Sequence, residues 1–150
     1  IRRALQAAGR QDTDAKILAT DISTKMLSMC KAGQYPAEAL KPIPNDERNR
    51  YFQLDRSTGN YQVSPTLRQM ITFARLNLAE PPYIMKGPLD AVFCRNVMIY
   101  FDNHVRSNIC DQVLRLLKPG GLFMIGHAES LQGPQLKEFV RIGASMYRKK

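Results

Sequence analysis

The chain has 150 residues, of which 44% are hydrophobic and 8% aromatic, enough to bury one sizeable core. Lys and Arg total 22 against 13 Asp and Glu, and this formal net charge of +9 favours acidic partners such as nucleic acid or a carboxylate-rich protein surface. The basic clusters do not alternate with aromatic residues as a base-stacking groove requires, so nucleic acid is disfavoured. The sequence contains no long apolar run and no signal-peptide layout, so we expect no membrane insertion and a cytoplasmic protein.

Cysteine and histidine usage argues against a metal or redox site. Cys30, Cys94 and Cys110 are widely separated and form no CxxC pair, which predicts free and mostly buried thiols. His127 and Glu129 lie in the motif GHAES, which is compatible with a catalytic pair or a metal site. The chain has only two histidines, in unrelated segments, so we expect no metal and interpret His127 as a loop or core-edge residue.

The first elements alternate between helix and strand. Residues 1–8 have apolar positions at helical spacing, and residues 16–21 form a short apolar run that ends in an acid, as a buried parallel strand does. A helix is predicted over residues 23–31, capped by Ser23 or Thr24 and ended by Gly33.

A polar, turn-rich stretch at about residues 34–66 is predicted to leave the main sheet as a small β excursion. Within it, we expect a short helix capped by Asn45 or Asp46 that continues through Leu54. Residues 56–60, with the sequence RSTGN, are expected to form the tip of a hairpin.

The second half predicts an α/β fold. Residues 71–76, 90–97 and 122–126 are apolar runs typical of strands, and a helix is expected from about 104 to 118 with Asp102 or Asn103 as its cap. An antiparallel pair, 139–142 with 145–148, is predicted at the C-terminus. Because parallel strands need helical crossovers, the alternation indicates a mainly parallel sheet covered on both faces, with an antiparallel C-terminal strand.

Polar residues follow several predicted strand ends, where such sheets bind ligands. Asp21 is placed to accept both hydroxyls of a ribose, and its alternative role is to cap the following helix. Asn77 offers an amide to an adenine edge and Leu78 adds backbone groups, although Asn is also a common turn residue. Arg95 and Asn96 interrupt an apolar strand end, and a buried arginine is rarely left without a paired or functional role.

Several segments together resemble the chemotaxis receptor methyltransferases, the CheR family, from Ile17 to the C-terminus. FCRNVMIYF followed by LKPGG and GHAES in this order is highly specific, whereas LKPGG alone is generic to methyltransferases. The segments are ATDIS at 19–23, NRYF at 49–52, LNL at 76–78, DAVFCRNVMIYF at 90–101 and LLKPGGLFMIGHAES at 116–130.

The resemblance implies a Rossmann-like domain that uses S-adenosylmethionine. It implies a protein-glutamate O-methyltransferase that converts glutamate side chains on the cytoplasmic signalling helices of chemoreceptors to methyl esters. Tyr100 is then expected beside the sulfonium methyl, where it orients the accepting carboxylate. The implied cofactor-binding residues are Asp21 for the ribose, Asn77 and Leu78 for the adenine, and Arg95 and Asn96 for the pocket lining.

The same resemblance predicts a partial domain over residues 1–150, with an inserted β-subdomain at about 34–66. Members of the family begin with a helical domain, a first strand and a Gly-containing loop, and this chain is expected to start in the helix that follows that strand. The β-subdomain is expected to contact receptors and, in some members, to bind a tethering C-terminal peptide. A piece of this kind leaves apolar edges open, so we expect it to be unstable, to dimerise by swapping or to belong to a longer polypeptide.

Two alternative functions are compatible with the same residues. One is a docking module of this fold that keeps the receptor-facing surface without binding cofactor. The other is a small-molecule methyltransferase. A positive field favours the receptor methyltransferase, because glutamate-rich helices are acidic.

Overall fold

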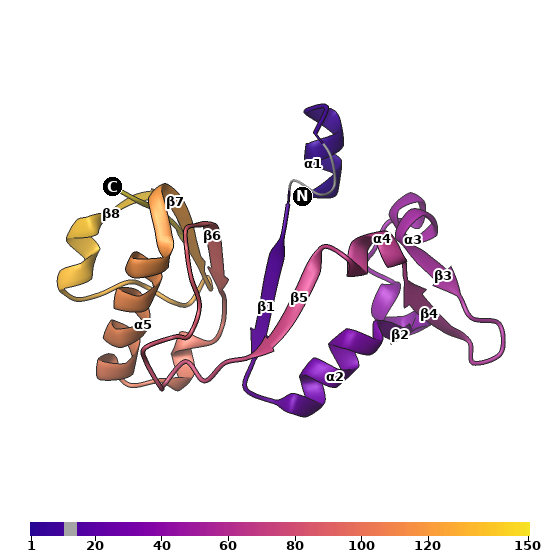
Figure 1. The fold of residues 1–150 in the computed structure, drawn as a ribbon, viewed down its shortest axis with the longest axis horizontal. Helices are drawn as coiled ribbons and strands as arrows, with labels where there is room; N and C mark the ends of the chain where they lie inside the picture. The colour runs from indigo at the N-terminus through magenta and orange to yellow at the C-terminus, as the bar shows by residue number, and fades with distance from the viewer. Residues whose placement is uncertain (11–14) are drawn as a thin grey trace. The chain divides into compact units, whose positions relative to one another are not determined.

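A computed structural model describes residues 1–10 and 15–150, which form two units, Ile1–Leu76 and Asn77–Lys150 (Figure 1). The elements of the first unit are α1 (Arg2–Ala7), β1 (Ile17–Asp21), α2 (Thr24–Ala32), β2 (Gln34–Pro36), η2 (Ala37–Leu40), α3 (Asn45–Tyr51), β3 (Phe52–Leu54), β4 (Asn60–Val63), α4 (Pro65–Arg68) and β5 (Ile71–Arg75). Those of the second are β6 (Leu89–Cys94), η3 (Met98–Tyr100), α5 (Asn103–Leu116), β7 (Leu117–Ile125), η4 (Pro134–Glu138), β8 (Phe139–Gly143) and β9 (Met146–Lys149).

The first unit is built around a parallel pair of strands. β1 pairs with β5 in register from Ile17 opposite Ile71 to Asp21 opposite Arg75, which confirms both predicted strands. The predicted helix between them is α2. Its cap is Ser23, whose hydroxyl accepts a hydrogen bond from the Met26 backbone N–H at 3.3 Å. Gly33 ends α2 in the left-handed region, where an L side chain is strained.

The predicted β excursion is present as an antiparallel sheet with strand order β2-β4-β3. The predicted extent of the short helix was wrong, because α3 ends at Tyr51 and Phe52–Leu54 pair with β4 instead. Its predicted cap was also wrong: Pro44 precedes the helix, and no described side chain caps it. The predicted hairpin tip joins β3 to β4, where Asp55 accepts hydrogen bonds from the backbone and hydroxyl of Ser57.

The second unit contains a mixed sheet with strand order β6-β7-β9-β8. β6 is parallel to β7, whereas β9 is antiparallel to both β7 and β8. With the parallel pair of the first unit, this arrangement confirms the α/β class and the antiparallel C-terminal strand. The class was predicted from apolar runs, typical of buried strands, that alternate with segments of helical spacing.

Both ends of helix α5 are stabilised by hydrogen bonds from or to side chains. Asp102 accepts a hydrogen bond from the Val105 N–H at 2.9 Å, as predicted for a cap. The helix ends at Leu116, two residues before the predicted end, because Leu117 already pairs with Leu89 of β6. Lys149 completes this end from β9, since its Nζ donates to the carbonyls of Leu114 and Leu117 at 2.7 and 2.8 Å.

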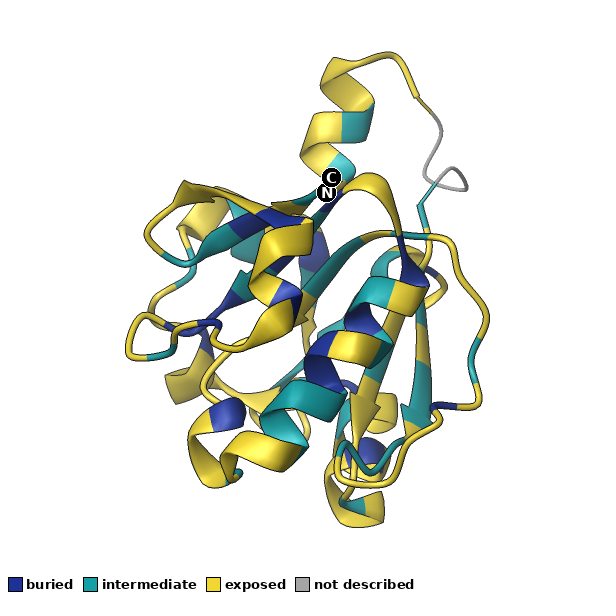
Figure 2. Ribbon diagram, turned by 90° about the vertical axis from the view of Figure 1, so that its left-hand side faces the viewer, coloured by how far each residue is buried: buried dark blue, intermediate teal, exposed yellow. Residues whose placement is uncertain are grey.

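The core of the second unit lies where α5 packs on the sheet. Fully buried side chains from helix and strand meet there, and the rings of Phe123 and Phe139 are 5.9 Å apart (Figure 2 shows buried positions in dark blue). Cys94 and Cys110 are buried in the same cluster, and burial raises the pKa of each thiol to about 11. Cys30 is half-buried in the first unit. All three thiols are free, as predicted.

Coverage of the strands on both faces stays a prediction. Leu18 of β1 is 41% exposed and Phe93 of β6 is 66% exposed. Successive side chains of a strand point to opposite faces of the sheet, and each of these two residues lies between strand neighbours that are more buried. None of the described helices has the length and apolar character needed to cross a membrane.

Candidate functional site

The carboxyl ends of β6 and β7 form the edge at which a ligand is expected in the second unit. These strands are parallel, with Cys94 opposite Ile125, so the segments that leave them start side by side. The predicted strand through Val97 was wrong, because β6 ends at Cys94. Asn96 follows with φ 59°, a left-handed conformation that asparagine tolerates better than most residues, and this turns the chain out of the sheet.

Arg95 and Asn96 are exposed, so the argument from a buried arginine was wrong. The early strand end explains the difference, since both side chains belong to the turn and not to the apolar strand. The turn itself is well packed at its base: Val97 packs against the core, and Met98 is buried.

The turn is held by the carboxylate of Glu129, which follows β7. Glu129 accepts hydrogen bonds from the backbone N–H groups of Asn96 at 3.1 Å, Val97 at 3.0 Å and Ile99 at 3.2 Å. It also accepts one from the N–H of Gly126. Both carboxylate oxygens are therefore engaged with the main chain of the two segments that leave the sheet.

The ionisation of Glu129 follows from these contacts. Burial by itself raises the pKa of this carboxyl, but the backbone hydrogen bonds, led by those from Gly126 and Asn96, lower it by more. The net direction is a pKa below the ordinary glutamate value, so the side chain is a carboxylate at neutral pH. An acceptor in that state makes the strong form of each hydrogen bond.

A glycine is required at position 126 because Asn96 and Glu129 lie close to its backbone. A Cβ atom there would meet the side-chain oxygen of Asn96, would lie 2.7 Å from Oε2 of Glu129 and would lie 2.9 Å from the Asn96 nitrogen. Real Cβ atoms do not occupy such positions, so any side chain at this position would push the turn away from β7.

Tyr100 lies at the end of the same turn. It is the last residue of η3 and its side chain is 80% exposed, so the phenol faces solvent. The backbone before Tyr100 is also hydrogen-bonded to α5, because Nε of Arg106 donates to the Met98 carbonyl at 2.8 Å. Tyr100 is thus an exposed side chain on a restrained backbone.

Asn77 and Leu78 begin the second unit in a separate segment. The Asn77 side-chain oxygen accepts from the Ala79 N–H at 3.1 Å, and the Leu78 carbonyl accepts from the Tyr83 hydroxyl at 2.9 Å. Desolvation by burial raises the pKa of Tyr83 to about 12. Within the described residues, the Asn77 amide NH₂ and the Leu78 N–H make no hydrogen bond, so both are free to donate to a ligand.

Tyr83 also fastens this segment to α5. Its N–H donates to Gln112 at 3.1 Å and its carbonyl accepts from Arg115 at 2.9 Å. Leu78 packs against the same buried cluster as Val97. The Asn77–Leu78 segment and the turn after β6 therefore share one core.

Asp21 lies in the first unit, at the carboxyl end of β1. One of its carboxylate oxygens accepts from the Ser23 N–H at 2.8 Å, and its carbonyl accepts from the Leu76 N–H at 3.1 Å. Ser23 is the helix cap, so the alternative interpretation of Asp21 as the cap was wrong. The other carboxylate oxygen has no hydrogen-bond partner among residues 1–10 and 15–150. The role of Asp21 in binding a ribose stays a prediction.

His127 is an exposed turn residue, whose Nδ1 lies 3.2 Å from the Ser145 hydroxyl. This agrees with its interpretation as a loop histidine. Among the described side chains, no group of three or more His, Cys, Asp or Glu is placed to hold a metal ion.

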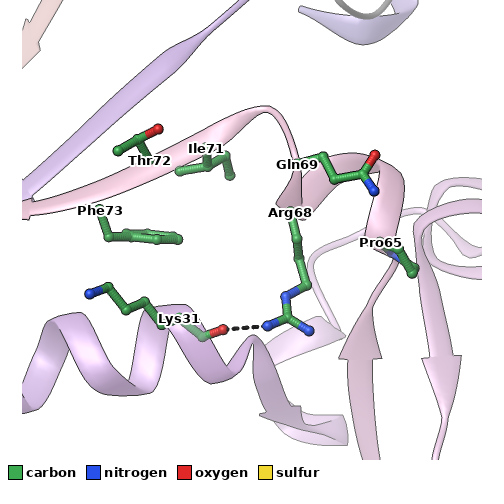
Figure 3. A pocket seen from close by; sticks show the side chains of 7 residues that line it. All are labelled: Lys31, Pro65, Arg68, Gln69, Ile71, Thr72 and Phe73. Carbon is green, nitrogen blue, oxygen red and sulfur yellow. Dashed lines mark hydrogen bonds between the residues drawn. The ribbon is translucent and has the colours of Figure 1, made fainter.

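A depression with a volume of about 550 Å³ lies elsewhere, in the first unit (Figure 3). It is lined by the end of α2, by α4 and by β5, with Lys31, Arg68 and Phe73 among its residues. Arg68 is already engaged, because it donates to the Lys31 carbonyl at 2.7 Å. The lining contains none of the predicted site residues, and the depression is wide open to solvent, so we do not assign the cofactor to it.

Sequence reasoning missed Glu129, Gly126 and Tyr83 as parts of the site. Glu129 was considered only as one of a catalytic pair or as a metal ligand. A usable signal was present for the first two, since Gly126 ends a predicted strand and Glu129 follows it closely, at the edge where such sheets bind ligands. Nothing in the sequence pairs Tyr83 with Leu78, because that contact depends on the path of an irregular segment.

Comparisons with known proteins identify relatives over most of the chain. The profile of the family described as "CheR methyltransferase, SAM binding domain" matches residues 2–147. The chain is 39% identical over 128 residues to chemotaxis protein methyltransferase 2 of Pseudomonas aeruginosa, covering 84% of this chain and 46% of that protein. It is 38% identical over 136 residues to the chemotaxis protein methyltransferase of Escherichia coli, covering 88% and 46%.

The chain spans about half the length of the curated relatives it matches. Among solved structures, it is similar to the [4+2]-cyclase SpnF, with a TM-score of 0.44 and 17% identity over 81% of this chain and 33% of that one.

Proposed function

Since the chain belongs to the CheR methyltransferase SAM-binding domain family, we propose that it binds S-adenosylmethionine and methylates glutamate side chains of chemoreceptors. The observation that carries the proposal is the match of residues 2–147 to this family, supported by relatives named chemotaxis protein methyltransferases. The turn that follows β6 supports it as well, because an exposed Asn96 and Tyr100 stand on a backbone that donates three hydrogen bonds to Glu129.

The donor and acceptor set fits the cofactor. Asp21 has a carboxylate oxygen free for ribose hydroxyls, and Asn77 and Leu78 have free N–H groups for the acceptor nitrogens of an adenine. Arg95 and Asn96 are exposed at the strand edge, where they would line the pocket. The assignment of these five residues to cofactor binding is part of the proposal.

Methyl transfer requires the protein mainly to align the methyl donor with the accepting carboxylate. S-adenosylmethionine supplies a methyl group already activated on a sulfonium. The side chains of the chain have to hold the acceptor in line and exclude water. We assign the first task to Tyr100, whose phenol orients the accepting glutamate carboxylate.

The proposed partner is the cytoplasmic signalling domain of a chemoreceptor, and the proposed compartment is therefore the cytoplasm. The net charge of +9 favours association with glutamate-rich helices. We assign receptor contact to the sheet β2-β4-β3. Two arginines lie beside its strands: Arg48 in α3, the helix that directly precedes β3, and Arg56 in the turn that joins β3 to β4.

Isothermal titration with S-adenosylmethionine tests cofactor binding. We expect saturable binding by the unaltered chain, and about a tenfold or greater loss of affinity in Asp21→Asn, because the neutral amide replaces the free carboxylate oxygen that accepts from the ribose. Asn keeps an oxygen for the Ser23 N–H, so the local turn is preserved. Asp46→Asn, on the exposed first turn of α3, is the matched control and should bind as the unaltered chain does.

No binding at millimolar ligand would contradict the proposal and would favour a receptor-docking module. Turnover of diverse small acceptors in the absence of receptor would instead favour a small-molecule methyltransferase. A methyl ester found on a receptor fragment, with none on small acceptors, supports the proposed substrate class.

Tyr100→Phe separates catalysis from cofactor binding. We expect turnover on a receptor fragment, measured with radiolabelled S-adenosylmethionine, to fall about tenfold or more while the calorimetric Kd for the cofactor changes less than about threefold. The reason is that the hydroxyl contacts the accepting carboxylate, whereas the ring is kept. Equal losses in turnover and in cofactor affinity would argue against a role of Tyr100 at the methyl group.

A further inference from the structure

We propose that Glu129 is a positioning residue of the methyl-transfer site, whose carboxylate fixes the turn Arg95–Tyr100 in the shape that presents Asn96 and Tyr100 to cofactor and acceptor. This inference rests on the proposed function and adds to it a residue that touches neither ligand. It starts from the contacts of one side chain with the main chain of two segments.

The contacts join two turns that leave neighbouring strands. Three of the four N–H donors belong to the turn after β6, at Asn96, Val97 and Ile99, and the fourth belongs to Gly126 after β7. Successive N–H groups that point at one anion form a concave binding site for it. Glu129 fills that site from within the chain, so the turn keeps its shape before any ligand arrives.

The conformation of Asn96 shows why the turn needs such support. Its φ of 59° lies in the left-handed region, which is unfavourable for a residue with a Cβ and persists where the surroundings fix it. The Asn96 N–H is donated to Glu129, and the glycine at position 126 leaves room for the Asn96 side chain against β7. Without the carboxylate, the N–H groups of Asn96, Val97 and Ile99 would lose the one acceptor that they share, and the turn would relax.

The same geometry argues against a direct chemical role for Glu129. A general base needs a free lone pair directed at the proton that it removes. Both oxygens of Glu129 accept main-chain N–H groups, and those bonds favour the ionised form by lowering the pKa of the carboxyl. Its effect on the reaction therefore passes through the backbone of the turn.

Glu129→Gln tests the role with little change of shape. The amide keeps one oxygen acceptor but removes the charge. Its NH₂ group, which is a donor only, would lie against backbone N–H groups and could accept no hydrogen bond from them. We expect the amide protons of Asn96, Val97, Ile99 and Gly126 to move upfield in nitrogen-15 correlation spectra and to exchange faster. The cofactor affinity should fall about tenfold or more. Glu138→Gln, an exposed position on η4, is the matched control and should change neither.

A measurement on the unaltered chain covers the case in which the variant does not fold. Lowering the pH should move the same four amide signals together, following the ionisation of the Glu129 carboxyl, whereas amides of α5 should not follow it. Four amides that titrate independently of that carboxyl would overturn the inference.

The outcomes also separate this inference from the proposed function. Cofactor binding by the unaltered chain with an unchanged Kd in Glu129→Gln overturns the positioning role and leaves the function standing. No cofactor binding by the unaltered chain overturns the function, and with it this role. Reduced affinity accompanied by the four amide shifts supports both.

Discussion

Replacing Phe123 with alanine is expected to lower the free energy of unfolding by about 3–5 kcal/mol. Phe123 has no exposed surface, lies in β7 and packs its ring against Phe139. Truncation removes buried apolar atoms and leaves a cavity between the sheet and α5. Urea unfolding followed by circular dichroism measures the loss, which is a large share of the stability of a typical domain.

Phe93→Ala is the matched control for this prediction. Phe93 lies on the neighbouring strand β6, directly beside Met124 of β7, but is 66% exposed. We expect its loss to change the free energy of unfolding by only about 0.5 kcal/mol. Comparable losses for the two phenylalanines would show that the buried and exposed faces of this sheet are not assigned correctly.

Gly126→Ala is expected to abolish measurable cofactor binding at concentrations that saturate the unaltered chain, and to lower the free energy of unfolding by about 1–3 kcal/mol. The added methyl would overlap the Asn96 side-chain oxygen and approach Oε2 of Glu129, so the turn after β6 and β7 cannot keep their present spacing. Titration calorimetry and thermal unfolding measure the two effects.

Gly143→Ala provides the comparison for that substitution. A Cβ at Gly143 would meet the Cβ of Met146 at 3.6 Å, which is an ordinary contact, and the position is in the same unit at the end of β8. We expect normal cofactor affinity and little change in stability. Cofactor binding retained by Gly126→Ala would mean that the tight spacing between Gly126 and Asn96 is not needed by the site.

According to these expectations, ligand binding by the second unit depends on the conformation of its backbone as much as on the side chains that contact the ligand. The exposed groups assigned to the ligand stand on segments held by Glu129, Arg106 and Tyr83. Hydrogen bonds from such supporting residues restrict the motion of the groups that contact ligands, which lowers the entropic cost of binding. Substitutions in the supporting residues should therefore alter affinity without removing a ligand contact.

The sequence by itself determined the α/β class, most strands, the helix starts to within two candidate caps each, Ser23 or Thr24 and Asp102 or Asn103, and the family through FCRNVMIYF and GHAES. These features are local, because apolar periodicity, capping and turn residues act over a few neighbours. The predicted end of a helix was wrong by a few residues where its last residues pair with a neighbouring strand instead. This occurs at Phe52–Leu54 and at the end of α5.

Only the tertiary structure decided which polar groups are engaged and which are free. Glu129 follows its hydrogen-bond partners in the turn after β6 by about thirty residues of sequence, and the parallel pairing of β6 with β7 brings them together. The exposure of Arg95 and the exclusion of a side chain at Gly126 depend on the same pairing. Contacts between residues distant in sequence are set by how strands align and helices pack, and no periodicity within either segment encodes them.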